Sequence, residues 1–267
     1  DDGSDVVSAH TAAECNDKIR AVMELHKSWY SLAGLSLNIQ KTTLMGFGFS
    51  PEPLDVGGFK IEAVHELKFL GMIIQNNLQL DRQVQSVASK ICSAAAKIRC
   101  EGRNFGTCDR RRLYMGWAQG ILCSNAPAFL PLISKTQSNE LQTSCNAAIR
   151  SVANLPRHSQ DRISISSVRT QLKIMSVAEI AEKIILTRAW KSRHSFRALN
   201  LDSEGPTTRA KSNGNVPQPI QKGMWGKIIS TQAQCAYNRL PKSIKEEEDE
   251  SMAKFRIYAH IFNNVVQ

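Results

Sequence analysis

Residues 34–74 constrain the fold of this chain more than any other stretch. Gly34 follows a helical pattern of apolar residues, and a glycine there suits the positive φ of the residue after a helix C-cap. Apolar pieces of strand length come next, and a connector rich in proline and glycine (residues 51–58) separates them. The stretch therefore predicts a helix that runs into a small antiparallel sheet.

Three motifs carry a resemblance to a known family. The run Gly34-Leu35-x-Leu37-Asn38-x-x-Lys41-Thr42 resembles the fourth palm motif of reverse transcriptases from non-LTR (LINE-type) retrotransposons. Phe69-Leu70-Gly71 resembles the primer-grip motif that follows it, and the opening Asp1-Asp2-Gly3-Ser4 is similar to the second half of the family's catalytic turn. The order and spacing of the motifs indicate the family more strongly than any one motif does.

The resemblance implies nucleotidyl transfer by two divalent metal ions, which carboxylates hold because Mg²⁺ prefers oxygen ligands. It places Asp1 and Asp2 in that catalytic metal site. It assigns Lys41 to the departing pyrophosphate, either as proton donor or as a neutralising charge. Phe69-Leu70-Gly71 would hold the primer end. Without the resemblance, these features are a solvated terminus, an exposed lysine at a strand start, and a buried strand with an incidental glycine.

The chain is basic, with a formal net charge of +10 and a pI near 9.4, which suits an anionic partner. Basic side chains outnumber acidic ones between residues 97 and 112. The resemblance places this cluster in the thumb, which contacts template–primer phosphates without reading bases. The residues expected to make these contacts are Lys97, Arg99, Arg103, Arg110, Arg111 and Arg112. The alternative is a solvated basic helix start, and under either interpretation the three consecutive arginines should contribute little packing.

Apolar residues that recur at spacings of three and four predict several helices. The first begins at Thr11, whose capping box with Glu14 would have that glutamate reach back to the Thr11 backbone. Another is expected from Asp81 to near Gly102, and its pattern resumes until Pro127 and Pro131 break it. Further helices are predicted over residues 136–153 and from a second capping box, Ser176 to Glu179.

We therefore predict an α+β, mostly α fold: a truncated palm with a small antiparallel sheet, followed by a helical thumb. Residues 1–76 would be the C-terminal part of the palm, and residues 77–199 the thumb-like domain. Residues 200–234, rich in glycine, proline, serine and basic side chains, predict a flexible basic linker. Residues 235–267 would form a C-terminal tail with a short helix.

The seven cysteines form no C-x-x-C pair, and the histidines do not flank them at zinc-site spacing. This pattern predicts buried, reduced thiols, which are typical of intracellular proteins. The sequence has neither a signal peptide nor an apolar run long enough to span a bilayer. We expect an intracellular location, in cytoplasm and nucleus, and no membrane partner.

The resemblance implies a fragment of an RNA-directed DNA polymerase. The parent enzyme would use Mg²⁺ and dNTPs and bind an RNA template and a DNA primer. The chain alone is predicted not to polymerise, because a two-metal site needs carboxylates from more than one strand. Two alternatives stay open: a non-catalytic basic helical module that binds nucleic acid or a protein partner, and a decayed element fragment without function.

Overall fold

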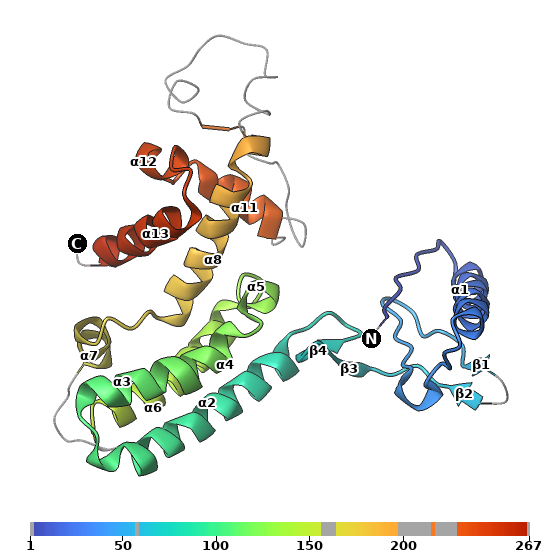
Figure 1. Cartoon of the computed structure of the whole chain (residues 1–267), viewed down its shortest axis with the longest axis horizontal. Helices are drawn as coiled ribbons and strands as arrows, with labels where there is room; N and C mark the ends of the chain where they lie inside the picture. The colour runs from blue at the N-terminus through green and yellow to red at the C-terminus, as the bar shows by residue number, and fades with distance from the viewer. Residues whose placement is uncertain (1–2, 57–58, 156–163, 197–214, 217–228, 266–267) are drawn as a thin grey trace, which may run out of the picture. The chain divides into compact units, whose positions relative to one another are not determined.

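The computed structural model describes residues 3–56, 59–155, 164–196, 215–216 and 229–265. The chain divides into two compact units, residues 1–83 and residues 84–267 (Figure 1). The described residues are mostly helical, with two small antiparallel sheets of two strands each. The predicted α+β, mostly α class is thus confirmed, although the strands form two separate hairpins instead of one sheet.

The helix α1 (Ala12–Leu32) begins where the sequence predicts. The Thr11 side chain accepts the backbone N–H of Glu14, as an N-cap does. The Glu14 carboxylate accepts the backbone N–H of His10, one residue before the N-cap, so the predicted capping box is shifted by one residue.

A Schellman motif ends α1. The backbone N–H of Leu35 donates to the carbonyl of Tyr30, and that of Gly34 donates to the carbonyl of Ser31. Gly34 has a φ of 69°, which a residue with a side chain adopts only at a cost. The predicted role of Gly34 after the C-cap is therefore confirmed.

Two hairpins follow α1. The strand β1 (Leu54–Val56) pairs with β2 (Phe59–Ile61), and β3 (Glu66–Phe69) pairs with β4 (Met72–Gln75), both antiparallel. Leu54 and Ile61 are the buried centre of the first unit. Partly buried side chains from α1, from the 3₁₀ turn η1 (Ile39–Lys41) and from the segments beside it pack against them: Ile19, Met23, Leu37, Ile39 and Leu44.

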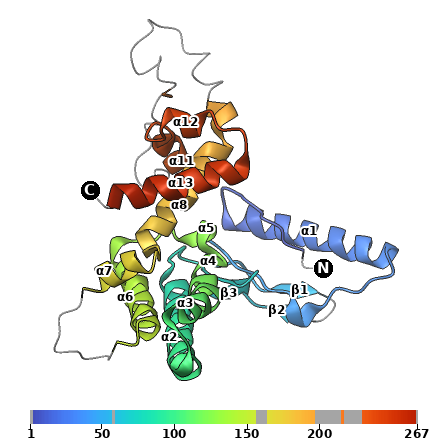
Figure 2. The ribbon, with the colours of Figure 1, turned by 60° about the vertical axis from the view of Figure 1, so that its left-hand side comes forward.

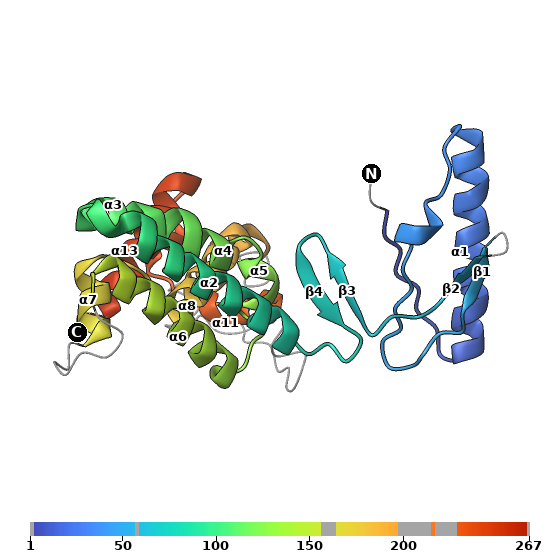
Figure 3. The ribbon, with the colours of Figure 1, turned by 90° about the horizontal axis from the view of Figure 1, so that it is seen from below.

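The helix α2 (Asp81–Glu101) matches the prediction in both its start and its buried face. The apolar side chains predicted to share that face are all buried: Val84, Val87, Ala88, Ile91, Ala95 and Ile98. A 3₁₀ turn, η2 (Gly102–Asn104), leads to α3 (Thr107–Tyr114), the π-helical turn η3 (Met115–Gln119) and α4 (Gly120–Cys123). Figure 3 shows α2 beside α3 and α4.

Pro127 was predicted to break the helical pattern, and this prediction is wrong in its mechanism. The chain bends at Ser124 and Asn125, and Pro127 then lies in the first turn of α5 (Ala126–Phe129). Proline fits there because the first turn of a helix needs no backbone N–H donor.

Three further helices complete the centre of the second unit: α6 (Lys135–Val152), α7 (Ile165–Gln171) and α8 (Val177–Lys191). The predicted capping box from Ser176 to Glu179 is present at the start of α8. A second one, from Ser134 to Gln137, begins α6 and was not predicted. The predicted apolar positions of α6 are buried: Leu141, Cys145, Ala148, Ile149 and Val152.

The helices α11 (Ile229–Tyr237), α12 (Lys242–Lys245) and α13 (Glu250–Val265) follow, and α11 and α13 both contact α8 (Figure 2). Residues 229–234 lie in the predicted linker but form the start of α11. Val216, also in that linker, is buried, and its backbone N–H and carbonyl both bond the Asn238 side chain. The linker prediction is therefore wrong for these residues, and its remaining part lies outside the described residues.

All seven cysteines are free thiols, as predicted. Burial was predicted as well, and this is wrong for four of them: Cys92, Cys100, Cys108 and Cys123 are exposed. Their positions on helices follow the solvent face of each helix, which cysteine spacing alone does not reveal. Among the described residues, no helix is both long enough and apolar enough to cross a membrane.

Candidate nucleic-acid interface

Asp1 and Asp2, the predicted metal ligands, lie outside the described residues. The segment that follows them runs along α1 in the opposite direction. An Asp5 carboxylate oxygen lies 2.6 Å from His26 Nε2, and Lys18 Nζ donates to the Ser8 carbonyl over 3.0 Å. Among the described residues, no group of three or more histidine, cysteine, aspartate or glutamate side chains could hold a metal ion.

Lys41 ends the 3₁₀ turn η1, which the Asn38 side chain caps. Asn38 Oδ1 accepts the backbone N–H of Lys41 over 3.3 Å, and the Thr42 hydroxyl donates to the Asn38 carbonyl over 2.9 Å. The polar residues of the motif thus fix its backbone, while Leu37 and Ile39 pack against Leu54 and Ile61. Lys41 itself is exposed to solvent.

Phe69-Leu70-Gly71 forms the tip of the β3–β4 hairpin. Phe69 pairs with Met72, so Leu70 and Gly71 are the two turn residues. Both have positive φ, 47° for Leu70 and 82° for Gly71, as a type I′ turn requires. Leu70 is 73% exposed. The alternative interpretation, a buried strand with an incidental glycine, is therefore wrong.

The strand β4 is fixed by the first turn of α2, near the tip of the hairpin and at its base. The buried Gln83 side chain accepts the backbone N–H of Ile73 over 2.9 Å. The Gln75 side chain accepts the backbone N–H of Arg82 over 3.3 Å. These bonds hold both Ile73, near the tip, and Gln75, at the base, while the Leu70 side chain of the turn stays exposed.

Lys97 lies in a groove that sequence reasoning missed. The α2–η3 groove, as we call it, has a volume of about 420 Å³, and α2, η3 and α4 line it with Lys90, Ser93, Lys97, Gly116, Trp117 and Ile121. Lys90 and Lys97 are seven residues apart and therefore share one face of α2. That spacing is visible in the sequence, whereas the contribution of Trp117 depends on how the two helices pack.

The other cations of the predicted cluster serve different purposes. Arg99 donates to the Ser151 hydroxyl over 3.5 Å and so joins α2 to α6. Arg103 is exposed and forms no ion pair with any described residue. The side chain of Arg110 packs against Gly102, where a Cβ atom would lie 2.9 Å from Arg110 Cγ. Arg103 is therefore available to an anionic ligand, while Arg99 and Arg110 take part in packing.

Arg111 and Arg112 differ as well. The half-buried guanidinium of Arg111 donates to the carbonyls of Leu172 and Lys173, just after α7. Arg112 is exposed and pairs with Asp109, three residues earlier on the same helix, over 3.0 Å. The expectation that all three consecutive arginines contribute little packing is wrong for Arg110 and Arg111, because each contacts a neighbouring segment of the second unit.

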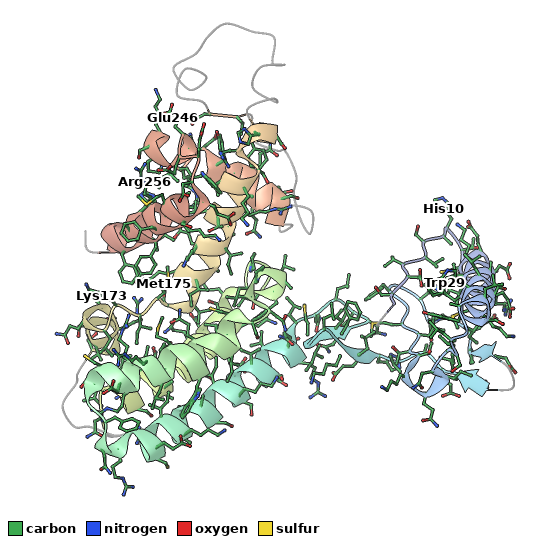
Figure 4. All side chains as sticks on the ribbon, viewed as in Figure 1. His10, Trp29, Lys173, Met175, Glu246 and Arg256 are labelled. Atoms are coloured by element: carbon green, nitrogen blue, oxygen red, sulfur yellow. The ribbon has the colours of Figure 1, made fainter. Side chains whose placement is uncertain are left out.

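The segment that Arg111 reaches is held by several hydrogen bonds and a nearly buried ion pair. Lys173, with a φ of 52°, follows the C-cap of α7, and Figure 4 shows it with Met175 between α7 and α8. Arg169 pairs with the Glu179 carboxylate over 2.6 Å, and both side chains are almost buried. The same carboxylate oxygen accepts the backbone N–H of Ser176. Arg111 therefore stabilises a folded junction, so its charge is not free to bind a phosphate.

The buried pair Tyr114 and Cys145 offers no reactive group. Burial raises the pKa of the Cys145 thiol to about 12, and its hydrogen bond with Tyr114 opposes that rise only in part. Burial also raises the pKa of Tyr114. Both groups stay neutral at physiological pH, so neither is a nucleophile or a base.

No protein-family model matches this chain, and comparisons with curated proteins and with solved structures also found no match.

Proposed function

We propose that this chain is the C-terminal part of a LINE-type reverse transcriptase and that it binds an RNA template paired with a DNA primer. Residues 1–76 correspond to the end of the palm and residues 77–199 to the thumb. In the parent enzyme, Asp1 and Asp2 would help hold Mg²⁺, and Lys41 would face the departing pyrophosphate. The order and spacing of three motifs in the sequence suggest this family.

The exposed tip of the β3–β4 hairpin is the observation that carries the proposal. A type I′ turn favours asparagine or glycine, and a leucine with positive φ is strained there. Strain of this kind persists mainly where the surrounding structure enforces it, often at binding sites. Leu70 is strained and exposed on a hairpin whose strand β4 is fixed by side-chain hydrogen bonds, as a residue that contacts a primer end would be.

The available cations of the second unit support the same function. Lys90, Lys97 and Arg103 are exposed and form no ion pair with any described residue. All three lie on α2 or on the 3₁₀ turn that follows it. Contacts between such side chains and phosphates fix the position of a nucleic acid without selecting its sequence.

Replacing Leu70 with asparagine tests the role of the hairpin tip. Asparagine tolerates positive φ, so the variant should be more stable than the parent by up to about 1–2 kcal/mol. If Leu70 contacts the primer, the variant should nevertheless bind an RNA–DNA template–primer several-fold more weakly. Fluorescence anisotropy gives the dissociation constant, and urea unfolding gives the stability.

Leu78→Asn is the matched control. Leu78 is also exposed and has a φ of 57°, but it lies in the turn after β4 and not at the hairpin tip. The Leu78→Asn variant should gain similar stability and bind the RNA–DNA template–primer with the same affinity as the parent. Equal affinity of both variants and the parent would contradict the proposed role of Leu70.

A second function, a non-catalytic interaction module, is favoured by the surface of α1. Leu25, Trp29 and Leu32 lie on one face of this helix and are exposed. Exposed apolar patches mark interaction sites. Under this second function the chain binds no hybrid at low salt, and sedimentation velocity finds an associated species. The variant with all three residues changed to serine should then be monomeric. Under the first function, hybrid binding is independent of that change.

A further inference from the structure

The α2–η3 groove combines an apolar wall with two cations. Ala94, Trp117 and Ile121 provide apolar surface, and Trp117 is only half-buried. The groove volume of about 420 Å³ lies in the range of small-molecule sites, which is about 300–1,000 Å³. A flat, partly apolar group such as a nucleobase therefore fits the groove in both size and chemistry.

The charge of the groove selects an anion. Lys90 and Lys97 lie two helical turns apart on α2, on either side of Ser93 and Ala94. Neither lysine forms an ion pair with any other described side chain. Both ammonium groups can therefore reach phosphates that flank a base on the apolar wall.

We propose that the α2–η3 groove binds an unstacked nucleotide of a single strand, with its base against Trp117 and its flanking phosphates at Lys90 and Lys97. The inference rests on the proposed nucleic-acid binding and deepens it. A base inside a duplex is stacked between its neighbours and cannot enter, so the groove takes a single strand. Aromatic platforms with basic edges bind single strands in this way with little sequence preference.

Gly116 keeps the groove open and provides the test. Apart from its chain neighbours and the backbone of its own helix, a Cβ atom on Gly116 would meet no atom within 4 Å, so a side chain can start there in open space. In Gly116→Leu the new side chain occupies the space proposed for the base. Gly106→Leu is the matched control, because Gly106 has the same open surroundings but lies before α3, away from the groove.

The experiment measures anisotropy of two labelled ligands: an oligouridine of about 12 nucleotides, which covers a typical single-strand site, and a blunt RNA–DNA hybrid. Gly116→Leu should bind the oligouridine about tenfold or more weakly than the parent, as expected for the loss of one stacked base. Its affinity for the hybrid should stay within about twofold. Gly106→Leu should match the parent for both ligands. Oligouridine should also quench the tryptophan fluorescence of the parent more than that of Trp117→Phe.

Four results would overturn the inference. If the parent binds the hybrid but not the oligouridine, or if Gly116→Leu binds the oligouridine as tightly as the parent, the groove is not a single-strand site, and the proposed function stands. If Gly116→Leu loses both ligands equally, the groove contacts duplex instead. If the parent binds neither ligand at low salt, the proposed function fails together with the inference.

Discussion

Leu141 of α6, in the second unit, is completely buried, whereas Leu32 of α1, in the first unit, is 88% exposed. The difference extends to both units. The first unit has two buried apolar side chains at its centre, Leu54 and Ile61, while its long helix leaves much of one apolar face in solvent. In the second unit, helices cover one another. The strands of the first unit are three or four residues long, whereas α1 has 21 residues, and Leu25, Trp29 and Leu32 of this helix stay exposed.

The largest expected effect concerns ion pairs. Glu179→Ala leaves Arg169 charged and nearly buried without its partner, which should cost about 3–5 kcal/mol of unfolding free energy. The matched change in the first unit, Glu52→Ala, removes an exposed pair with Arg20 and should cost about 0–1 kcal/mol. Urea unfolding followed by circular dichroism measures both. Comparable losses would show that the two units stabilise charges alike.

A second prediction compares the apolar residues directly. Leu141→Ala should lower the unfolding free energy by about 2–5 kcal/mol, because it creates a cavity in the core. Leu32→Ala removes a side chain that packs against little and should change stability by no more than about 0.5 kcal/mol. If Leu32→Ala is as destabilising as Leu141→Ala, that face of α1 is covered in solution.

A smaller effect separates two adjacent arginines. Arg111→Ala removes charged hydrogen bonds to the end of α7 and should cost about 1–3 kcal/mol. Arg112→Ala breaks one exposed pair on its own helix and should change stability by less than about 1 kcal/mol. Thermal unfolding of the two variants checks this. An unchanged melting temperature for Arg111→Ala would show that the Arg111 side chain contributes no more to stability than a solvated surface residue.

Much of the second unit could be predicted from local sequence. The buried faces of α2 and α6 follow from apolar spacing, and the start of α8 follows from its capping box, because both depend on residues only three or four apart. Pro127 was misinterpreted because proline in a first helical turn and proline after a helix look alike in a sequence. The backbone of Val216 bonds Asn238, 22 residues later, and no local pattern shows a contact over that distance.

The sequence was enough to identify the motifs of the candidate site, but not their backbone conformation or their contacts. Phe69-Leu70-Gly71 was identified, but the positive φ of Leu70 follows from strand pairing on both sides of the turn. The basic cluster was identified as a unit, yet Arg111 and Arg112 point to different partners because one side of α3 faces a neighbouring segment. Lys90 and Trp117 come together only when two helices pack.

The most direct test of the central claim is the salt dependence of binding to an RNA–DNA hybrid. If about six or more phosphates are contacted, the affinity should fall by orders of magnitude between about 50 and 200 mM salt. Changing Arg103 to alanine should reduce the slope of log affinity against log salt by roughly one. No binding at low salt, or an affinity that does not change with salt, would contradict the account.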